Sequence, residues 1–219
     1  MERLGAQIGI VRGVVGAMRT HARLLGRQDH AGTASMEVRR DALVAASEVV
    51  LFTNGAVRRM NRETGSESVA TVGEISVYPN SINTVPGSVQ LGIDVRDLRM
   101  GNMERLTKKI HVMIASLKKK YGISSQVAVD DVRSPVVLSK MVQNTIASAC
   151  KEFKLKSRPM NSGATHDAQN MAAVTQTGMI FVPSRNGVSH TPAEWTDWED
   201  VERGYRVYDL TLRKLLSRV

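Results

Sequence analysis

Two alternating segments and the long connection between them, VATVGEISVYPNSINTVPGSVQLGIDVRD at residues 69–97, decide the fold of this chain. One face of the first segment carries Val69, Thr71, Gly73, Ile75 and Val77, and one face of the second carries Val89, Leu91, Ile93 and Val95. An alternation of this kind predicts a half-buried strand. The intervening YPNSINTVPG is dense in residues that form turns. We therefore expect an antiparallel pair of strands joined by a long connection.

The segments on either side extend this pair into a larger unit. Residues 14–24 alternate between apolar or small residues and Arg or His, which predicts another strand. Residues 39–62 and 106–117 have apolar residues at helical spacing, and Gly122 is expected to stop the second of these helices. The segment SSQVAVDDV, which begins at Ser124, predicts one further strand. The predicted order is βαββαβ.

A βαββαβ unit closes as a two-layer sandwich with four antiparallel strands on one side and both helices on the other. We expect this ferredoxin-like domain to occupy residues 13–132 and the chain to be of the α+β class. The pattern changes after residue 132. Residues 133–219 predict a helix over about 138–153, a glycine-rich loop, a short buried strand GMIFV and a helix over about 198–216.

Residues 133–219 predict only one apolar strand, GMIFV. They do not supply the neighbouring strands and helices that would cover both of its edges and both of its faces. The opening residues, which include IGIVRGVV, are expected to supply one neighbouring strand. We therefore interpret residues 1–12 and 133–219 as parts of a larger α/β domain, into which the small domain is inserted.

The composition is that of an ordinary globular protein, with 219 residues, 42% hydrophobic and 23% charged. No window approaches the roughly 18 consecutive apolar residues of a membrane helix, and the first residues lack the features of a secretory signal. Cys150 is the only cysteine, which excludes an intrachain disulfide, and we expect a cytoplasmic protein. The net charge of +9 raises the possibility of an anionic partner. The densest run of positive charge is the three lysines at 118–120. They lie at the end of a predicted helix, which indicates a solvated face.

Three of the five histidines lie in loops rich in small residues, where a ligand can approach the backbone closely, namely His30, His166 and His190. His21 and His111 lie within a predicted strand and helix, where a surface or packed role is expected. No HxxxH or HExxH spacing is present.

Two further polar residues suit a small ligand. The amide of Asn83 can donate to a carbonyl or ureido oxygen, and the fork of Arg96 can hold a carboxylate with two hydrogen bonds. Turn chemistry for Asn83 and a surface cation for Arg96 are the alternatives.

Four motifs occur together, in the order DHAGTASMEVRRDAL, GEISVYPNSINTVPGSVQLGIDVRD, SGATHDAQNM and MIFVPSRNGVSHTPAEW. This set resembles the zinc-dependent amidohydrolases that include N-carbamoyl-L-amino-acid hydrolase, allantoate amidohydrolase and ureidopropionase, which are similar to aminoacylases and related metallopeptidases. The resemblance covers essentially the whole chain. It implies a zinc catalytic domain interrupted by a lid domain that also forms a homodimer, and a small carboxylated ureido or carbamoyl substrate.

The resemblance also implies a role for each motif residue. His190 would be a metal ligand for Zn, or for Mn, Co or Ni, and His166 would contact the substrate at the reaction centre. His30 would reach the active site from the lid of the partner subunit and stabilise the polarised oxygen. Asn83 and Arg96 would hold the polar groups and the carboxylate of the substrate. No nucleic acid and no membrane is implied as a partner.

The chain departs from this family pattern at two points. Thr165 stands where the family usually has glycine, and a β-branched residue narrows the choice of backbone conformations. The half that carries the other metal ligands and a catalytic glutamate is expected before Met1. Because one histidine does not hold a hydrolytic metal, we expect negligible hydrolysis by this polypeptide alone.

Two alternatives to an amidohydrolase remain open at this point. The chain could be a truncated, non-catalytic dimerisation module. It could also be an RNA-binding βαββαβ domain, although such domains stack bases on aromatic residues of the central strands, and SVQLGIDV has none. The identity of the substrate is open.

Overall fold

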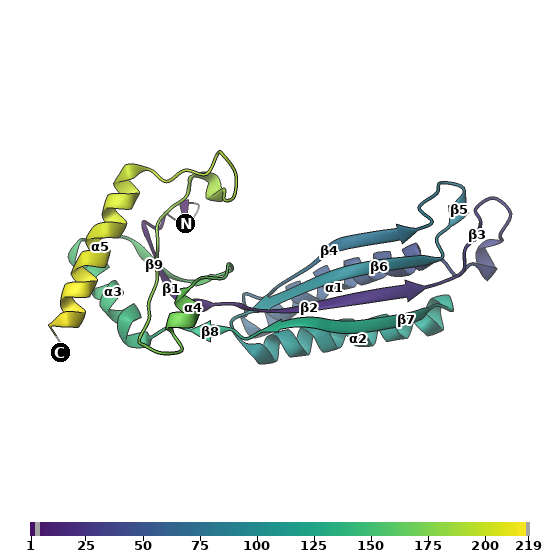
Figure 1. The fold of residues 1–219 in the computed structure, drawn as a ribbon, viewed down its shortest axis with the longest axis horizontal. Helices are drawn as coiled ribbons and strands as arrows, with labels where there is room; N and C mark the ends of the chain where they lie inside the picture. Colours follow the sequence, from purple (N-terminus) through teal and green to yellow (C-terminus); the bar gives the residue numbers. More distant parts are fainter. Residues whose placement is uncertain (3–4, 218–219) are drawn as a thin grey trace. The chain divides into compact units, whose positions relative to one another are not determined.

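The structure, a computed structural model, describes residues 1–2 and 5–217 and divides the chain into two compact units (Figure 1). The insert unit is Gly16–Pro135, and the split unit combines Met1–Val15 with Val136–Val219. The mixed α and β composition with antiparallel sheets that the sequence predicts is confirmed.

The insert unit is built on a four-stranded sheet in the order β4-β6-β2-β7, in which all neighbours are antiparallel. Its strands are β2 (Gly16–Leu25), β4 (Val69–Tyr78), β6 (Ser88–Asp97) and β7 (Ser124–Arg133). In the central pair, Gly16 lies opposite Asp97 and Leu25 opposite Ser88, so β2 and β6 align along their whole length.

Two long helices, α1 (Ala42–Thr64) and α2 (Met100–Tyr121), cover one face of this sheet (Figure 1). The N-cap Asp41 begins α1, because its side chain accepts hydrogen bonds from the backbone N–H groups of Leu43 and Val44. Gly122 ends α2 in the left-handed conformation with φ of 63°, as the sequence predicts.

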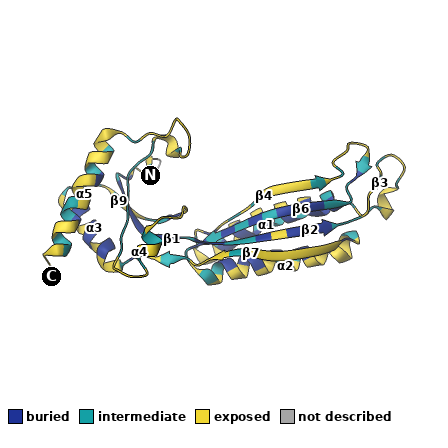
Figure 2. Cartoon of the chain, viewed as in Figure 1, coloured by how far each residue is buried: buried dark blue, intermediate teal, exposed yellow. Residues whose placement is uncertain are grey.

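The core of the insert unit lies between the helices and the sheet. Figure 2 shows buried residues along β2 and β6, where they alternate with more exposed ones. The buried strand residues include Leu24, Leu91 and Ile93, and the buried helix residues include Met60 and Ile110. The side chains between them on these strands form the open face of the sheet.

The sequence predicts that Val69, Thr71, Gly73, Ile75 and Val77 share one face of a strand, and this prediction is wrong. The register between β4 and β6 shifts between Val72 and Glu74, so that a β-bulge interrupts the period of two. Ala70, Val72 and Val77 pack against the core, whereas Val69 is 54% exposed and Ile75 is 52% exposed.

The split unit has β1 (Ile8–Val14) at the centre of a small sheet. β1 pairs antiparallel with β10 (Ile180–Phe181) and β8 (Val136–Val137), and parallel with β9 (Ser157–Ser162). The pairing of the opening residues with GMIFV is confirmed, since Gly9 lies opposite Phe181. The sequence did not predict β8 or β9.

The helices of the split unit are α3 (Lys140–Glu152), α4 (Ala168–Met171) and α5 (Trp198–Leu216), and the predicted helices at 138–153 and 198–216 correspond to α3 and α5. Its core is a cluster of Ile8, Ile10, Val142, Ile146, Ala149, Cys150 and Val207. Within residues 1–2 and 5–217, no helix is long and apolar enough to cross a membrane.

Candidate functional site

The structure brings His30 and Asn83 together at one end of the insert unit. The short strands β3 (Asp29–His30) and β5 (Thr84–Val85) pair antiparallel, with His30 opposite Thr84. The backbone N–H of Ala31 donates to the carbonyl of Asn83 at 2.9 Å. We call residues 26–41 and 79–87 the tip loops. Two predicted site residues that are far apart in the sequence therefore lie side by side.

Backbone contacts fasten the tip loops to each other. The N–H of Gly26 donates to the carbonyl of Gly87 at 2.8 Å, and the N–H of Arg27 donates to the carbonyl of Arg40 at 2.9 Å. A Cβ atom on Gly26 would lie 1.9 Å from the carbonyl oxygen of Arg40, so only glycine fits this crossing. This requirement for glycine cannot be seen in the local sequence, because the contact joins two loops.

The side chains of His30 and Asn83 are both exposed, and each can donate a hydrogen bond. The oxygen Oδ1 of Asn83 accepts from the hydroxyls of Ser81 (2.8 Å) and Thr84 (3.3 Å). Because these hydroxyls occupy the oxygen, the amide nitrogen is the group that Asn83 offers to a ligand. Nδ1 of His30 accepts from the backbone N–H of Gly32 at 3.0 Å.

Arg96 lies on the open face of the four-stranded sheet, at the end of β6 away from the tip loops. It pairs across the sheet with Ala17 and Val69, whereas the tip loops adjoin Ser88 at the start of β6. The guanidinium donates to Asp94 through Nε (2.7 Å) and Nη2 (3.2 Å). Burial alone would raise the pKa of Asp94, but hydrogen bonds from Arg96 and Arg19 outweigh it and lower that pKa. The structure does not bring Arg96 to His30 and Asn83.

His166 lies in the split unit, just before α4. Its ring contacts the ring of Phe181 on β10, with centroids 5.9 Å apart. The preceding Thr165 is exposed. Among the described residues, the non-glycine positions with positive φ are Asn80, Lys154, Asn186 and His190. The backbone at position 165 therefore accommodates threonine without a left-handed conformation.

His190 lies in the loop between β10 and α5 and has φ of 59°. Non-glycine residues with this backbone conformation are uncommon and often occur at functional sites. The backbone N–H of His190 donates to the Glu194 carboxylate at 2.8 Å, and the base of the loop closes where the N–H of Arg185 donates to the carbonyl of Trp195. The imidazole is exposed.

These histidines do not make a metal site by themselves. Within the part of the chain that the structure describes, no group of three or more His, Cys, Asp or Glu side chains could hold a metal ion. A catalytic zinc needs about three protein ligands. The described residues therefore fit one ligand of such a site, and no step of a reaction follows from them through a metal.

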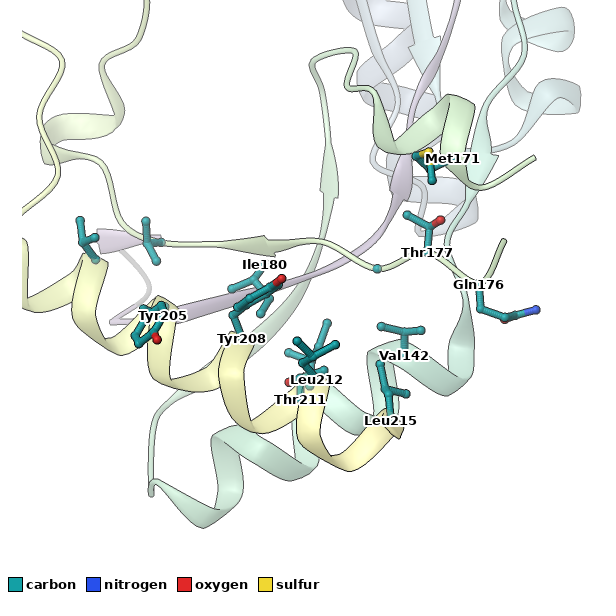
Figure 3. A pocket seen from close by; sticks show the side chains of 15 residues that line it. Val142, Met171, Gln176, Thr177, Ile180, Tyr205, Tyr208, Thr211, Leu212 and Leu215 are labelled. Carbon is teal, nitrogen blue, oxygen red and sulfur yellow. The ribbon is translucent and has the colours of Figure 1, made fainter. Parts of the chain in front are cut away.

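An open apolar groove of about 660 Å³ lies in the split unit between α5, α3 and β10. Figure 3 shows Tyr205, Tyr208 and Leu212 of α5 along the groove, with Val142 of α3 and Ile180 of β10 also lining it. The close approach of these elements needs small residues, since a Cβ on Gly204 would lie 2.6 Å from Val182.

The α5 helix has apolar residues on two sides. Val207 is buried in the core of the split unit, whereas a second stripe at spacings of four, three and four is exposed, and consists of Val201, Tyr205, Tyr208 and Leu212. Such spacing is typical of a helix that packs against another helix. No described residue covers this stripe fully.

Comparison with known proteins shows what the chain is similar to. It is 37% identical to the N-carbamoyl-L-amino-acid amidohydrolase of Paenarthrobacter aurescens, across 100% of this chain and 52% of that protein. It is 34% identical to the allantoate amidohydrolase of Escherichia coli (strain K12), across 98% of this chain and 51% of that protein. The chain spans about half the length of the curated relatives that it matches.

A solved structure gives the same result. An amidase of the hydantoinase/carbamoylase family from Burkholderia multivorans has a TM-score of 0.90 and 30% identity, across 96% of this chain and 50% of that chain. Residues 5–214 match Peptidase family M20/M25/M40 along most of the sequence. The chain therefore belongs to Peptidase family M20/M25/M40.

Proposed function

We propose that this chain is the lid and the C-terminal part of a metal-dependent amidohydrolase that hydrolyses the carbamoyl or ureido C–N bond of a small carboxylated substrate. The names of the relatives support this class of substrate, since they are amidohydrolases of N-carbamoyl-L-amino acids and of allantoate. The observation that carries the proposal is the pairing of β3 with β5, which places His30 beside Asn83.

The proposed roles follow from the groups that each residue presents. The imidazole of His30 and the amide of Asn83 donate to the oxygen of the carbamoyl or ureido group, where negative charge develops during hydrolysis. Arg96 holds the carboxylate of the substrate, and the Asp94 carboxylate orients its guanidinium. His166 contacts the substrate at the reaction centre. His190 is proposed as one ligand of a zinc ion, or of Mn, Co or Ni, whose other ligands lie outside the described residues.

The positions of Arg96 and His30 support a site shared between two copies of the chain. From Ser88, beside the tip loops, to Arg96, strand β6 extends by roughly 25 Å at the usual rise per residue. A small ureido acid cannot span that distance. We therefore propose that the insert unit is a ferredoxin-like lid and dimerisation domain, and that His30 and Asn83 of one copy meet a substrate held by Arg96 of the other.

The open groove supports the proposal that the split unit is part of a larger catalytic domain. The relatives are about twice as long as the match, so each has another half that this chain does not span. We propose that a helix of that half packs on Val201, Tyr205, Tyr208 and Leu212. The same half would supply the remaining metal ligands and the general base.

An RNA-binding role receives no support from the open face of the sheet. The paired residues of the central strands that face outward there are Ala17, Arg19, His21, Arg23, Leu25, Ser88, Gln90, Gly92, Asp94 and Arg96. None of these is a Phe, Tyr or Trp on which bases could stack. Arg19 instead forms ion pairs with Asp94 and Asp131.

The decisive experiment combines the chain with the half that it does not span, taken from the Paenarthrobacter amidohydrolase. Hydrolysis of N-carbamoyl amino acids and of allantoate is measured with added Zn, Mn or Co. We expect no turnover by the chain alone and metal-dependent turnover by the combination. Asn83→Ala and Arg96→Ala should each reduce kcat/KM, and each should be compared with the exposed control Arg58→Ala.

Two results would contradict the proposal. Turnover by the chain alone, well above that of its His190→Ala variant, would show that a complete site exists without the other half. A combination that binds but gives no turnover with any metal or substrate would favour the non-catalytic dimerisation module. Mixed dimers carrying Arg96→Ala in one copy and His30→Ala in the other should recover part of the activity if the site is shared.

A further inference from the structure

The turn that follows β3 is closed on His30 itself. The backbone N–H of Ala34 donates to the carbonyl of His30 at 3.1 Å. Inside this turn, the N–H of Gly32 donates to Nδ1 of the His30 ring at 3.0 Å. The ring is thus attached to the backbone that immediately follows it, although the side chain is exposed.

This hydrogen bond determines which ring nitrogen carries the proton. In a neutral imidazole one nitrogen donates and the other accepts, and the tautomer follows from the bond that one of them makes. Because Nδ1 of His30 accepts from Gly32, the proton lies on Nε2. His30 therefore presents an N–H donor, and not a lone pair, to a group beyond the tip loops.

Arg39 holds the same turn from the other side. Its Nη2 donates to the carbonyls of Ala31 (2.6 Å) and Ala34 (3.0 Å), and its Nε donates to the carbonyl of Ala34 (3.1 Å). A planar guanidinium can bridge two carbonyls in this way, whereas the ammonium of lysine is a single point charge. The backbone N–H of Ala31 also donates a hydrogen bond to the carbonyl of Asn83.

We propose that Arg39 is a positioning residue for His30. By bridging Ala31 and Ala34, Arg39 keeps the N–H of Gly32 directed at Nδ1 and so leaves the Nε2–H of the exposed ring as the donor that His30 presents. This inference rests on the proposed function for its catalytic consequence, since His30 is there the donor to the substrate oxygen. The geometry of the turn itself does not depend on that function.

The first test is nuclear magnetic resonance of the whole chain labelled with ¹⁵N, recorded at a pH of about 8.5, where an ordinary histidine is neutral. The expected result is a protonated Nε2 and an unprotonated Nδ1 in His30, with a coupling through the hydrogen bond between Nδ1 and the Gly32 amide. In Arg39→Lys we expect this coupling to be lost and the Gly32 amide to exchange with solvent at least about tenfold faster, because the turn opens locally.

The matched control is Arg40→Lys, the same substitution at the next residue. The side chain of Arg40 lies against Gly122 and not against the turn, so the Gly32 coupling and exchange rate should stay as in the wild type. A protonated Nδ1 in the wild-type chain, or a Gly32 amide that Arg39→Lys leaves unchanged, would overturn the inference.

The second test uses the combination with the half of the relative described above. Arg39→Lys should lower kcat by about 100-fold with little change in KM, because a misplaced donor affects the transition state more than substrate binding. Equal kcat values for Arg39→Lys and Arg40→Lys would show that Arg39 does not position a catalytic group. Absence of turnover in the unsubstituted combination would count against the proposed function, while the spectroscopic test would still decide the role of Arg39 in the turn.

Discussion

The two units of this chain differ in how far each covers its own apolar surface. The insert unit buries long strands under two helices, α1 and α2, of 23 and 22 residues. In the split unit, β8 and β10 have two residues each, and the apolar stripe of α5 stays exposed along a groove. A face of this kind usually marks a surface that another segment covers. The insert unit is therefore expected to fold by itself, and the split unit to gain stability from a partner segment.

The largest expected effect comes from the core of the insert unit. Ile110 is 1% exposed on α2, and Ile110→Ala should lower the free energy of unfolding by about 3 kcal/mol, since it removes buried carbon atoms and leaves a cavity. Val112 is 63% exposed on the same helix, and Val112→Ala should change that free energy by less than about 0.5 kcal/mol. Urea titration followed by circular dichroism measures both. Equal effects would contradict the described core.

A second pair of substitutions compares the crossing of the tip loops with an open helix surface. In Gly26→Ala the new methyl group would meet the carbonyl of Arg40, and we expect a loss of about 1–3 kcal/mol. Gly55 lies within α1 and has nothing within 4 Å of an added Cβ, so Gly55→Ala should stabilise the chain by about 0.5–1 kcal/mol. Thermal unfolding should show opposite signs for the two, and the same sign would count against the crossing.

The groove of the split unit should respond differently from either core. Tyr205 and Tyr208 are 66% and 57% exposed, so replacing both with serine should change stability by less than about 1 kcal/mol. The same double substitution should reduce the binding of a hydrophobic dye and weaken association with the other half of the relative. Tyr78→Ser, at a similarly exposed tyrosine of the insert unit, is the control. Unchanged dye binding and association would show that the groove is not a docking surface.

The smallest expected effect is a dependence on pH that involves two histidines of the insert unit. Hydrogen bonds to Asp130 and Glu74 raise the pKa of His21, whereas burial lowers the pKa of His111. The stabilisation from His21 is fully present below the unfolded value of about 6.5 and is lost as the pH rises through its raised folded pKa.

The contribution of His111 has the opposite sign. Above a pH of about 6.5 the partly buried His111 ring is neutral and does not destabilise the fold. As the pH falls toward the lowered folded pKa, protonation of the unfolded chain becomes favoured and stability is lost. In unfolding measured across this range, His21→Gln should flatten the alkaline side of the stability curve and His111→Gln the acidic side. Identical curves for the two variants would contradict the described environments.

Periodicity made much of the fold predictable. The alternation in residues 14–24 and 89–95, the helical spacing in residues 106–117 and the glycine after them are local signals, and they correspond to the observed β2, β6 and α2. Strand β9 could not be predicted from the sequence, because its residues SRPMNS contain a proline and show no apolar alternation. Its place in the sheet comes from its parallel pairing with β1, which is a contact between distant segments.

The sequence by itself determined the long helices and most of the long strands, the family resemblance and the residue types that could bind a small polar substrate. Only the tertiary structure decided how those residues are grouped. It placed His30 beside Asn83, put Arg96 at the end of the four-stranded sheet away from the tip loops and brought Arg39 to the turn that carries His30. The physical reason is that periodicity reports which side of an element is buried, whereas strand register and backbone hydrogen bonds between loops depend on segments far apart in the chain.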